Sequence, residues 1–347
     1  MTINGALLWY AKFIRENYAI IIIATLLMAL IVGLVSSGPG RFIQQFNVLL
    51  IVVMIGAMGF TITFKSLGAA AKDWRGLSLG LVLNFLFAPF LCWLLAALFL
   101  TDQPGFAVGL ILIGAVPCAG MAMVWAGLLK GDVPLATVIN AVTMILAPFI
   151  IPLIMLFFAG RFVVIDTGAM FIQILSTVLV PLVAGVTIRE ILERRTRAVK
   201  GMHDTTVSPH VPQKKTGIQE LLPIMPAISA TMAVLLMFMA INTSVPLIMK
   251  NLASLVPLIV STILIFPLLF LVSYVIGMRF FPRGKNIAIT YSSGMKNLPI
   301  AIGIAAISFG GLEMLPVAVG FAFQMLTAVV FYQIFTRASP GSDNNNP

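Results

Sequence analysis

Two short stretches carry residue types that could do chemistry inside an otherwise apolar chain. The stretch "ITYSSGMKNLPIAIG" (289–303) places Lys296 near the middle of an apolar run, where a lysine costs at least about 2.5–3.5 kcal/mol. The stretch "GAVPCAGMAMVWAG" (114–127) places Cys118 beside a proline in another such run. An ammonium can pair with an anion or exchange a proton, and a thiol binds soft metals. Both residues are therefore candidates for function.

Each of the two residues also has a simpler interpretation. A lysine near a helix end can extend its side chain to the bilayer surface, but Lys296 lies about ten residues, roughly 15 Å of helical rise, from either end of its run. We therefore predict a functional charge that loads and releases a proton or binds an anionic substrate. Cys118 could equally be a small buried hydrophobic residue.

The elements that must position these residues are membrane helices. Hydrophobic residues make up 60% of the chain and charged residues 9%, whereas a soluble domain carries roughly 25% charged residues. The apolar runs are continuous rather than alternating, which favours helices, and most are near the roughly 20 residues that cross a bilayer. We predict an all-α polytopic membrane protein with spans at 18–36, 46–64, 76–100, 105–129, 133–159, 168–188, 221–241, 252–278, 286–309 and 314–336.

The basic residues predict the orientation of these spans. With the N-terminus in the cytoplasm, 17 of the 21 Lys and Arg residues fall in cytoplasmic segments and three on the other side. This distribution follows the positive-inside rule and places both termini in the cytoplasm. It also explains the net charge of +10 without a nucleic-acid partner, so the bilayer is the expected partner.

A hydrophilic stretch divides the spans into two sets of five. Residues 189–220 are expected to form a basic cytoplasmic linker that carries His203 and His210, and residues 337–347 a disordered tail. The first repeat with the sixth helix occupies 1–188, and the remaining helices of the second repeat occupy 221–336. An odd number of helices per half predicts an inverted repeat, the arrangement of many secondary transporters.

The fourth span of each half is interrupted at the same place. Pro117 is followed by Gly120, and Gly294 precedes Pro299. Each proline removes a backbone donor, and unwound backbone persists in a membrane only where it lines a cavity or is buried in protein. We predict that broken helices 4 and 9 cross at the midplane of the bilayer.

The motifs of enzymes and pumps are missing from the sequence. It has no G-x-x-x-x-G-K-[ST] nucleotide loop and no H-E-x-x-H helix, and its acidic residues lie outside the spans or at their ends. We therefore expect a protein that is not an enzyme and that uses no cofactor.

Three segments resemble the superfamily that joins the bile acid:sodium symporters and the arsenical-resistance (arsenite efflux) permeases. They are "AMGFTITFKSLGAAAKDWRG" (57–76), "PCAGMAMVWAGLLKGDVPLATVINAVTMILAP" (117–148) and "SGMKNLPIA" (293–301). The resemblance implies ten helices, arranged as a panel and a core that contains the two broken helices.

The symporter branch implies a sodium site that this sequence lacks. Where sodium-coupled members have a Glu and a Gln around "GM", this chain has Ser292 and Lys296, and Ala122 and Met123 replace their Ser–Asn pair. Hard cations need oxygen ligands. We therefore expect sodium coupling to be lost, with Lys296 and Ser292 as the coupling residues and no metal site.

The permease branch implies a metalloid site. Permeases carry a cysteine in the fourth helix followed by "AM" and "VW", and "IN" in the fifth helix, and here Cys118 and Asn140 match. Arsenic(III) is thiophilic. Two positions depart from this branch: Ala126 replaces an asparagine, and "NLPIA" contains no acid.

Three further polar residues are candidate substrate ligands or structural groups. Asn140 and Thr143 lie on neighbouring faces of the fifth helix, where polar side chains also join helices to each other. Asn297 lies beside a break, where it could satisfy freed backbone groups or bind substrate. With Cys118, these residues form the predicted substrate site.

Together these observations predict a ten-helix secondary transporter of the plasma or inner membrane. The leading prediction is sodium-independent efflux of arsenite or a similar metalloid, coupled to protons or to the membrane potential. The alternative is transport of an organic anion such as a bile-acid-like sterol, a keto acid or pantoate. A third class, a scaffold or receptor that does not transport, predicts that substitution of Cys118 or Lys296 leaves function unchanged.

Overall fold

The computed structural model describes residues 3–62, 73–203, 221–250, 252–309 and 311–337. Within these ranges the chain forms helices and no β-strand. The helices are α1 (Ile3–Val35), α2 (Gly38–Gln44), α3 (Asn47–Gly59), α5 (Trp74–Val82), α6 (Ala88–Phe99), α7 (Pro104–Ala115), α8 (Met121–Leu128), α9 (Val133–Ile154), α10 (Thr167–Ile174), α11 (Val180–His203), α13 (Met225–Lys250), α14 (Leu255–Phe280), α15 (Arg283–Gly294), α16 (Leu298–Ser308) and α17 (Met314–Arg337).

Three π-helical turns lengthen these helices. Leu83–Phe87 joins α5 to α6, Met155–Ala159 follows α9, and Leu175–Leu179 joins α10 to α11. A π turn shifts the hydrogen bonds from i→i+4 to i→i+5 and often marks a functional position. The first of these turns contains Asn84.

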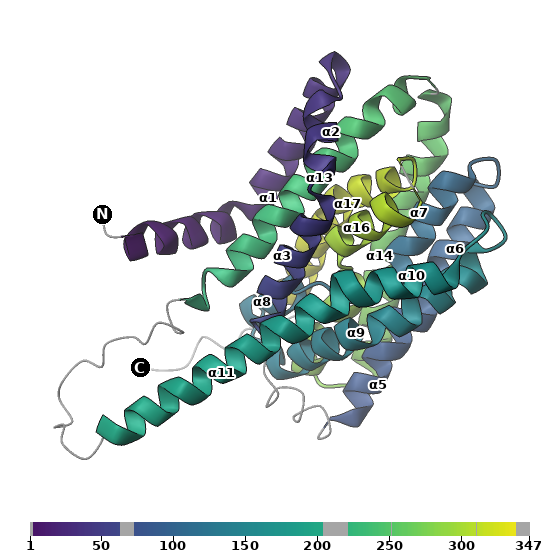
Figure 1. The fold of residues 1–347 in the computed structure, drawn as a ribbon. Coiled ribbons are helices and arrows are strands. Elements are labelled where there is room, and N and C mark those ends of the chain that lie inside the picture. The colour runs from purple at the N-terminus through teal and green to yellow at the C-terminus, as the bar shows by residue number, and fades with distance from the viewer. Residues whose placement is uncertain (1–2, 63–72, 204–220, 251, 310, 338–347) are drawn as a thin grey trace.

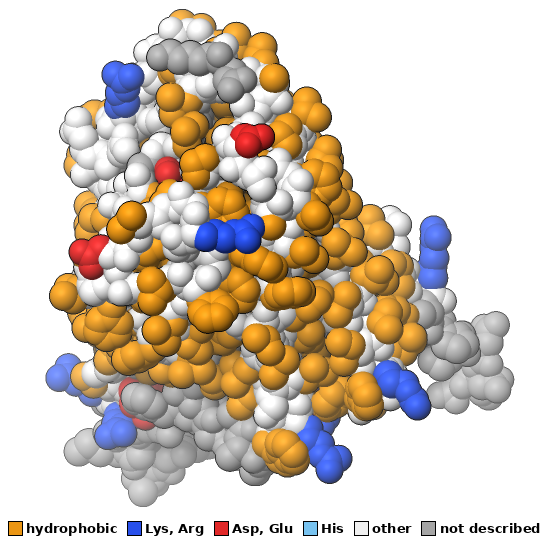
Figure 2. All heavy atoms as spheres, turned by 90° about the vertical axis from the view of Figure 1, so that its right-hand side faces the viewer, with side chains coloured by type: hydrophobic (Ala, Val, Ile, Leu, Met, Phe, Trp, Pro, Cys, Tyr) orange, Lys and Arg blue, Asp and Glu red, His pale blue; other side chains and the backbone are white. Residues whose placement is uncertain are grey.

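The length and composition of the helices make this a multi-pass membrane protein. In the described ranges six helices are long and apolar enough to cross a bilayer, or eight if two bent pairs each count as one span. Two shorter apolar helices, α7 and α16, are parts of interrupted segments. Hydrophobic side chains cover most of the face in Figure 2, with several Lys and Arg side chains along its lower edge.

Several boundaries differ from the sequence prediction. The first helix begins at Ile3 rather than residue 18 and bends by 77° between Tyr18 and Ile20, so the basic N-terminal segment is helical (Figure 1). Helix α11 runs to His203, through the first part of the predicted linker, and α13 runs to Lys250. Residues 204–220 and 338–347, which carry the rest of the linker and nearly all of the tail, lie outside the described residues.

The helices form two groups that meet in the middle of the molecule. Helix α13 packs along α1 and α3, and α3 packs on α11. In the second group, α14 packs on α15 and α17, and α6 packs on α7, around the interrupted helices. The groups are joined where α13 contacts α16 and α17 (Figure 1).

Aspartates cap the N-terminal ends of several of these helices, which explains why acidic residues occur at the ends of the spans. Asp132 accepts a hydrogen bond from the Leu135 amide at 2.9 Å, and Asp166 accepts one from Ala169 at 2.9 Å. Such caps satisfy backbone donors that have no partner inside the helix.

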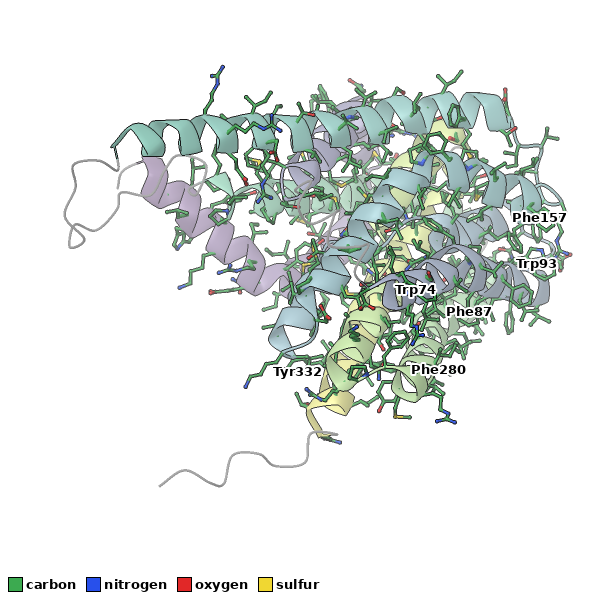
Figure 3. All side chains as sticks on the ribbon, turned by 90° about the horizontal axis from the view of Figure 1, so that it is seen from below. Trp74, Phe87, Trp93, Phe157, Phe280 and Tyr332 are labelled. Atoms are coloured by element: carbon green, nitrogen blue, oxygen red, sulfur yellow. The ribbon has the colours of Figure 1, made fainter. Side chains whose placement is uncertain are left out.

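Aromatic side chains lie around the bundle. Figure 3 shows Trp93 and Phe157 toward one end of the bundle, and the Arg161 guanidinium lies 4.8 Å from the Trp93 ring centre.

A close helix contact gives a first prediction, on stability. A Cβ added at Gly109 of α7 would lie 2.1 Å from the backbone oxygen of Glu313, whereas one added at Gly127 of α8 would lie 3.6 Å from its nearest neighbour. We expect Gly109→Ala to lower the melting temperature of the purified protein, since overpacking costs about 1–3 kcal/mol. Gly127→Ala is the control and should be neutral or stabilising, because alanine favours a helix over glycine by about 1 kcal/mol. Equal melting temperatures for the two variants would contradict this contact.

Candidate functional site

The site begins where two helices break. Helix α7 ends at Ala115, and Val116 is extended, with φ −70° and ψ 154°. Helix α15 ends at Gly294, and Met295 is extended, with φ −95° and ψ 109°. Both predicted interruptions are therefore present.

The proline and glycine residues predicted to interrupt the helices lie in or beside the two breaks. Pro117 lies inside the first break and Gly120 caps α8, while Gly294 is the last residue of α15 and Pro299 lies in the first turn of α16. Glycine is needed at 294, because an added Cβ would lie 2.4 Å from the Phe270 ring.

The two breaks cross and are joined by backbone hydrogen bonds. The Ala119 amide donates to the Met295 oxygen at 2.9 Å, and the Asn297 amide donates to the Pro117 oxygen at 2.8 Å. Cys118 and Lys296 lie opposite each other in this short antiparallel bridge. The exchange pairs backbone groups that the breaks would otherwise leave unsatisfied.

Lys296 extends its ammonium into a cage of oxygen atoms. Nζ donates to the Asn84 backbone oxygen at 2.9 Å, to Asn84 Oδ1 at 3.1 Å and to the Val116 oxygen at 3.2 Å. All three ammonium hydrogens therefore have an acceptor. The residue is 0% exposed, so its side chain does not reach the surface. Val116 follows the C-terminal end of α7, which favours a positive charge.

Asn84 is held in place by the same network. Its Nδ2 donates to the Gly80 oxygen at 2.8 Å and to the Ser292 oxygen at 3.1 Å. With both donors used, its Oδ1 is fixed toward the ammonium. The residue lies in a π turn, and its backbone oxygen also faces Nζ.

Two other side chains support the breaks. Gln324 Oε1 of α17 accepts a hydrogen bond from the Lys296 backbone amide at 2.8 Å. Thr143 of α9 accepts the Cys118 amide at 3.3 Å, and its hydroxyl donates to the Asn140 oxygen at 2.9 Å. Thr143 therefore joins α9 to the first break.

A cavity of about 210 Å³ adjoins the crossing. It reaches Thr61 and Ile62 beyond α3 and Pro226 near the start of α13. The described lining contains no Asp, Glu or Arg. Its most frequent member is methionine, at positions 54, 58, 121, 123, 295 and 325.

The predicted substrate residues separate into two sets. Asn140 and Asn297 line the cavity, and Lys296 lines it while its Nζ is bound to Asn84 and Val116. Cys118 and Thr143 are 0% exposed and do not belong to the described lining. The Cys118 thiol donates to the Ala119 oxygen at 3.4 Å.

Ser292, the second predicted coupling residue, lies beside the oxygen cage. It is fully buried, and its hydroxyl has no hydrogen-bond partner within the described part of the chain. Its backbone oxygen accepts a hydrogen bond from Asn84 Nδ2. The serine therefore adjoins the oxygen cage without lining the described cavity.

Asn84 and Gln324 are the site residues that sequence reasoning missed. Asn84 is the sole amide side chain in the predicted third span, and that isolation was the available signal. Methionine at helical spacing is usually part of a core, so the sequence alone does not distinguish the methionines that line the cavity from packing residues. Among the described residues, no group of three His, Cys, Asp or Glu is placed to hold a metal ion.

Comparison with known proteins assigns the chain to a family of membrane proteins. A family model described as the Sodium Bile acid symporter family matches residues 48–251. YocS of Bacillus subtilis, described as an uncharacterized sodium-dependent transporter, is 31% identical over 156 residues, 44% of this chain and 46% of that protein.

The names of two other relatives describe arsenical resistance and sodium/metabolite cotransport. The arsenical-resistance protein Acr3 of Alkaliphilus metalliredigens is 30% identical over 148 residues, 40% of this chain and 42% of Acr3. The chloroplastic probable sodium/metabolite cotransporter BASS1 of Arabidopsis thaliana is 26% identical over 150 residues, 43% of this chain and 37% of that protein. In each case the match spans less than half the length of the relative.

Proposed function

The chain belongs to the Sodium Bile acid symporter family, a family of transporters, and on that premise we propose that it is a secondary active transporter in which a resident lysine takes the place of a bound sodium ion. The observation that carries the proposal is the Lys296 ammonium, held by three oxygen atoms beside the crossed breaks. Such an oxygen set also suits a hard cation.

The proposed architecture is ten transmembrane helices in two inverted repeats of five. The breaks lie in the fourth helix of each half if α7 with α8, and α15 with α16, each count as one helix. This matched pair supports the repeat, and a crossing of broken helices at the midplane supports alternating access. The distribution of Lys and Arg supports cytoplasmic termini in an inner or plasma membrane.

We propose efflux of arsenite or a similar small metalloid as the function, driven by protons or by the membrane potential. Similarity to Acr3 supports this substrate, and the ammonium supports independence from sodium. A lysine that gives up its proton in one conformation and regains it in the other would link transport to a proton gradient.

A second candidate is transport of an organic anion. Similarity to BASS1 supports it, as does the methionine-rich lining of the cavity, because methionine side chains adapt to apolar ligands of varied shape. In this case Lys296 would neutralise the anion.

Transport into proteoliposomes tests the proposal. We expect arsenite uptake into inverted vesicles under a proton gradient at the same rate with and without sodium, since a tethered ammonium replaces the ion. The measurement is the initial rate of radiolabelled arsenite uptake, with empty liposomes as the control. A requirement for sodium, or uptake of a keto acid or a bile acid with no uptake of arsenite, would contradict the efflux function.

A further inference from the structure

The cavity is lined by two amide side chains whose hydrogen-bonding capacity is only partly used. Asn140 is 3% exposed and Asn297 is 3% exposed, and both line the cavity. Asn140 Oδ1 is buried and has no partner within the described part of the chain. Leaving a buried acceptor unpaired is costly, so this atom would gain a hydrogen bond from a ligand that displaces the side chains covering it.

Asn297 offers the complementary group. Its Oδ1 accepts the Ile300 amide at 3.4 Å and caps α16. Its Nδ2 faces sulfur atoms, Met58 Sδ at 3.7 Å and Met144 Sδ at 3.8 Å. A thioether is a weak acceptor, so an oxygen atom placed there would be a better partner for Nδ2.

Met58 lies between the two asparagines. A Cβ added at Gly120 would lie 3.7 Å from Met58 Cε and 3.8 Å from Asn140 Nδ2. Met58 and Asn140 therefore approach the same backbone position. Met58 Sδ contacts Asn297 Nδ2. Methionine is flexible and polarizable, so its side chain can move aside when a ligand enters.

The charges near this pair limit the ligand. The described lining has no acid and no arginine, and Lys296 uses its ammonium on Asn84 and Val116. An anion would therefore find no cation with a free N–H donor, and a cation would find no acid. The thiol of Cys118 does not belong to the described lining.

We propose that Asn140 and Asn297 form a recognition pair for small uncharged hydroxyl-bearing solutes, of which a trihydroxo metalloid is one. A ligand hydroxyl donates to Asn140 Oδ1, and a ligand oxygen accepts from Asn297 Nδ2. Selection rests on hydrogen bonds rather than on a sulfur–metalloid bond. This inference rests on the proposed function for its substrate site, and it extends the ligand class to hydroxides with no affinity for thiols, such as boric acid.

Binding of radiolabelled arsenite to purified protein in nanodiscs tests the pair without any gradient. We expect boric acid to displace arsenite, and Asn140→Leu to weaken arsenite binding about tenfold, or about 1.4 kcal/mol. Asn47→Leu is a matched control: Asn47 is buried with an unpaired Oδ1 in the described structure but lies outside the cavity lining, and we expect unchanged affinity. The melting temperature of each variant reports folding, and Asn297→Leu is a second test of the pair.

Three results would overturn the inference. The first is that arsenite fails to bind the wild type, and the second is that boric acid fails to compete with it. The third is that Cys118→Ser loses arsenite binding while Asn140→Leu retains it. Binding that follows the expected pattern in a protein that fails to transport arsenite would overturn the proposed function alone.

Discussion

Replacement of Lys296 by glutamine is expected to reduce sodium-independent transport strongly and to create a dependence on sodium. The change removes the ammonium from three oxygen acceptors. A single hydrogen bond to a charged group contributes about 1.5–3 kcal/mol, so loss of even one of the three is expected to lower the uptake rate without sodium by about one to two orders of magnitude. The glutamine carbonyl would add an oxygen to those of Asn84 and Val116, a ligand set suited to sodium. Initial rates measured over a range of sodium concentrations test this.

Two further variants separate the loss of charge from the gain of oxygen. Lys296→Met has a similar length but adds no oxygen, so we expect it to be inactive at every sodium concentration. Lys12→Gln makes the same change at an exposed position of α1 and should leave the rate unaltered. Full sodium-independent activity in Lys296→Gln would show that the ammonium takes no part in coupling.

Replacement of Asn84 by leucine is expected to be one of the most destabilising changes in the molecule. It removes Oδ1 from the Lys296 ammonium and both amide donors from the Gly80 and Ser292 oxygens. Removing one partner of a buried charge costs about 3–5 kcal/mol. We expect a large decrease in melting temperature and loss of transport, measured on purified protein and in proteoliposomes.

A double variant identifies the buried charge as the cause. In Asn84→Leu/Lys296→Met the ammonium is absent, so the second substitution should restore part of the stability lost in the first. Such a coupling between contacting residues is measured by a double-mutant cycle. Additive losses in the double variant would mean that Asn84 stabilises the helices independently of Lys296.

The positions of the breaks could be predicted from the sequence because they follow from local chemistry. Pro117 and Pro299 lack backbone donors, and the glycines beside them permit close packing. Helical identity and the membrane location likewise follow from continuous apolar runs. These features depend on a few neighbouring residues, so one sequence is enough to show them.

The partners across the breaks could not be predicted, because they depend on packing between distant segments. Asn84 and Lys296 are separated by 212 positions, and no local pattern relates them. The same is true of Gln324, which holds the amide of Lys296 from another helix. Similarly, the orientation of the Cys118 thiol follows from how the two breaks pair with each other, and its place in the sequence indicates only that it lies at a break.

The covalent attachment of the ammonium has a consequence for how the site responds to its surroundings. A diffusible ion occupies its site according to its concentration in the medium, and the occupied fraction falls when the ion is scarce. The Lys296 ammonium is attached by its own side chain to the bridge between the breaks, so its effective concentration is set by geometry and remains constant. Dilution of the medium removes a bound ion from a carrier, but it leaves this charge in place.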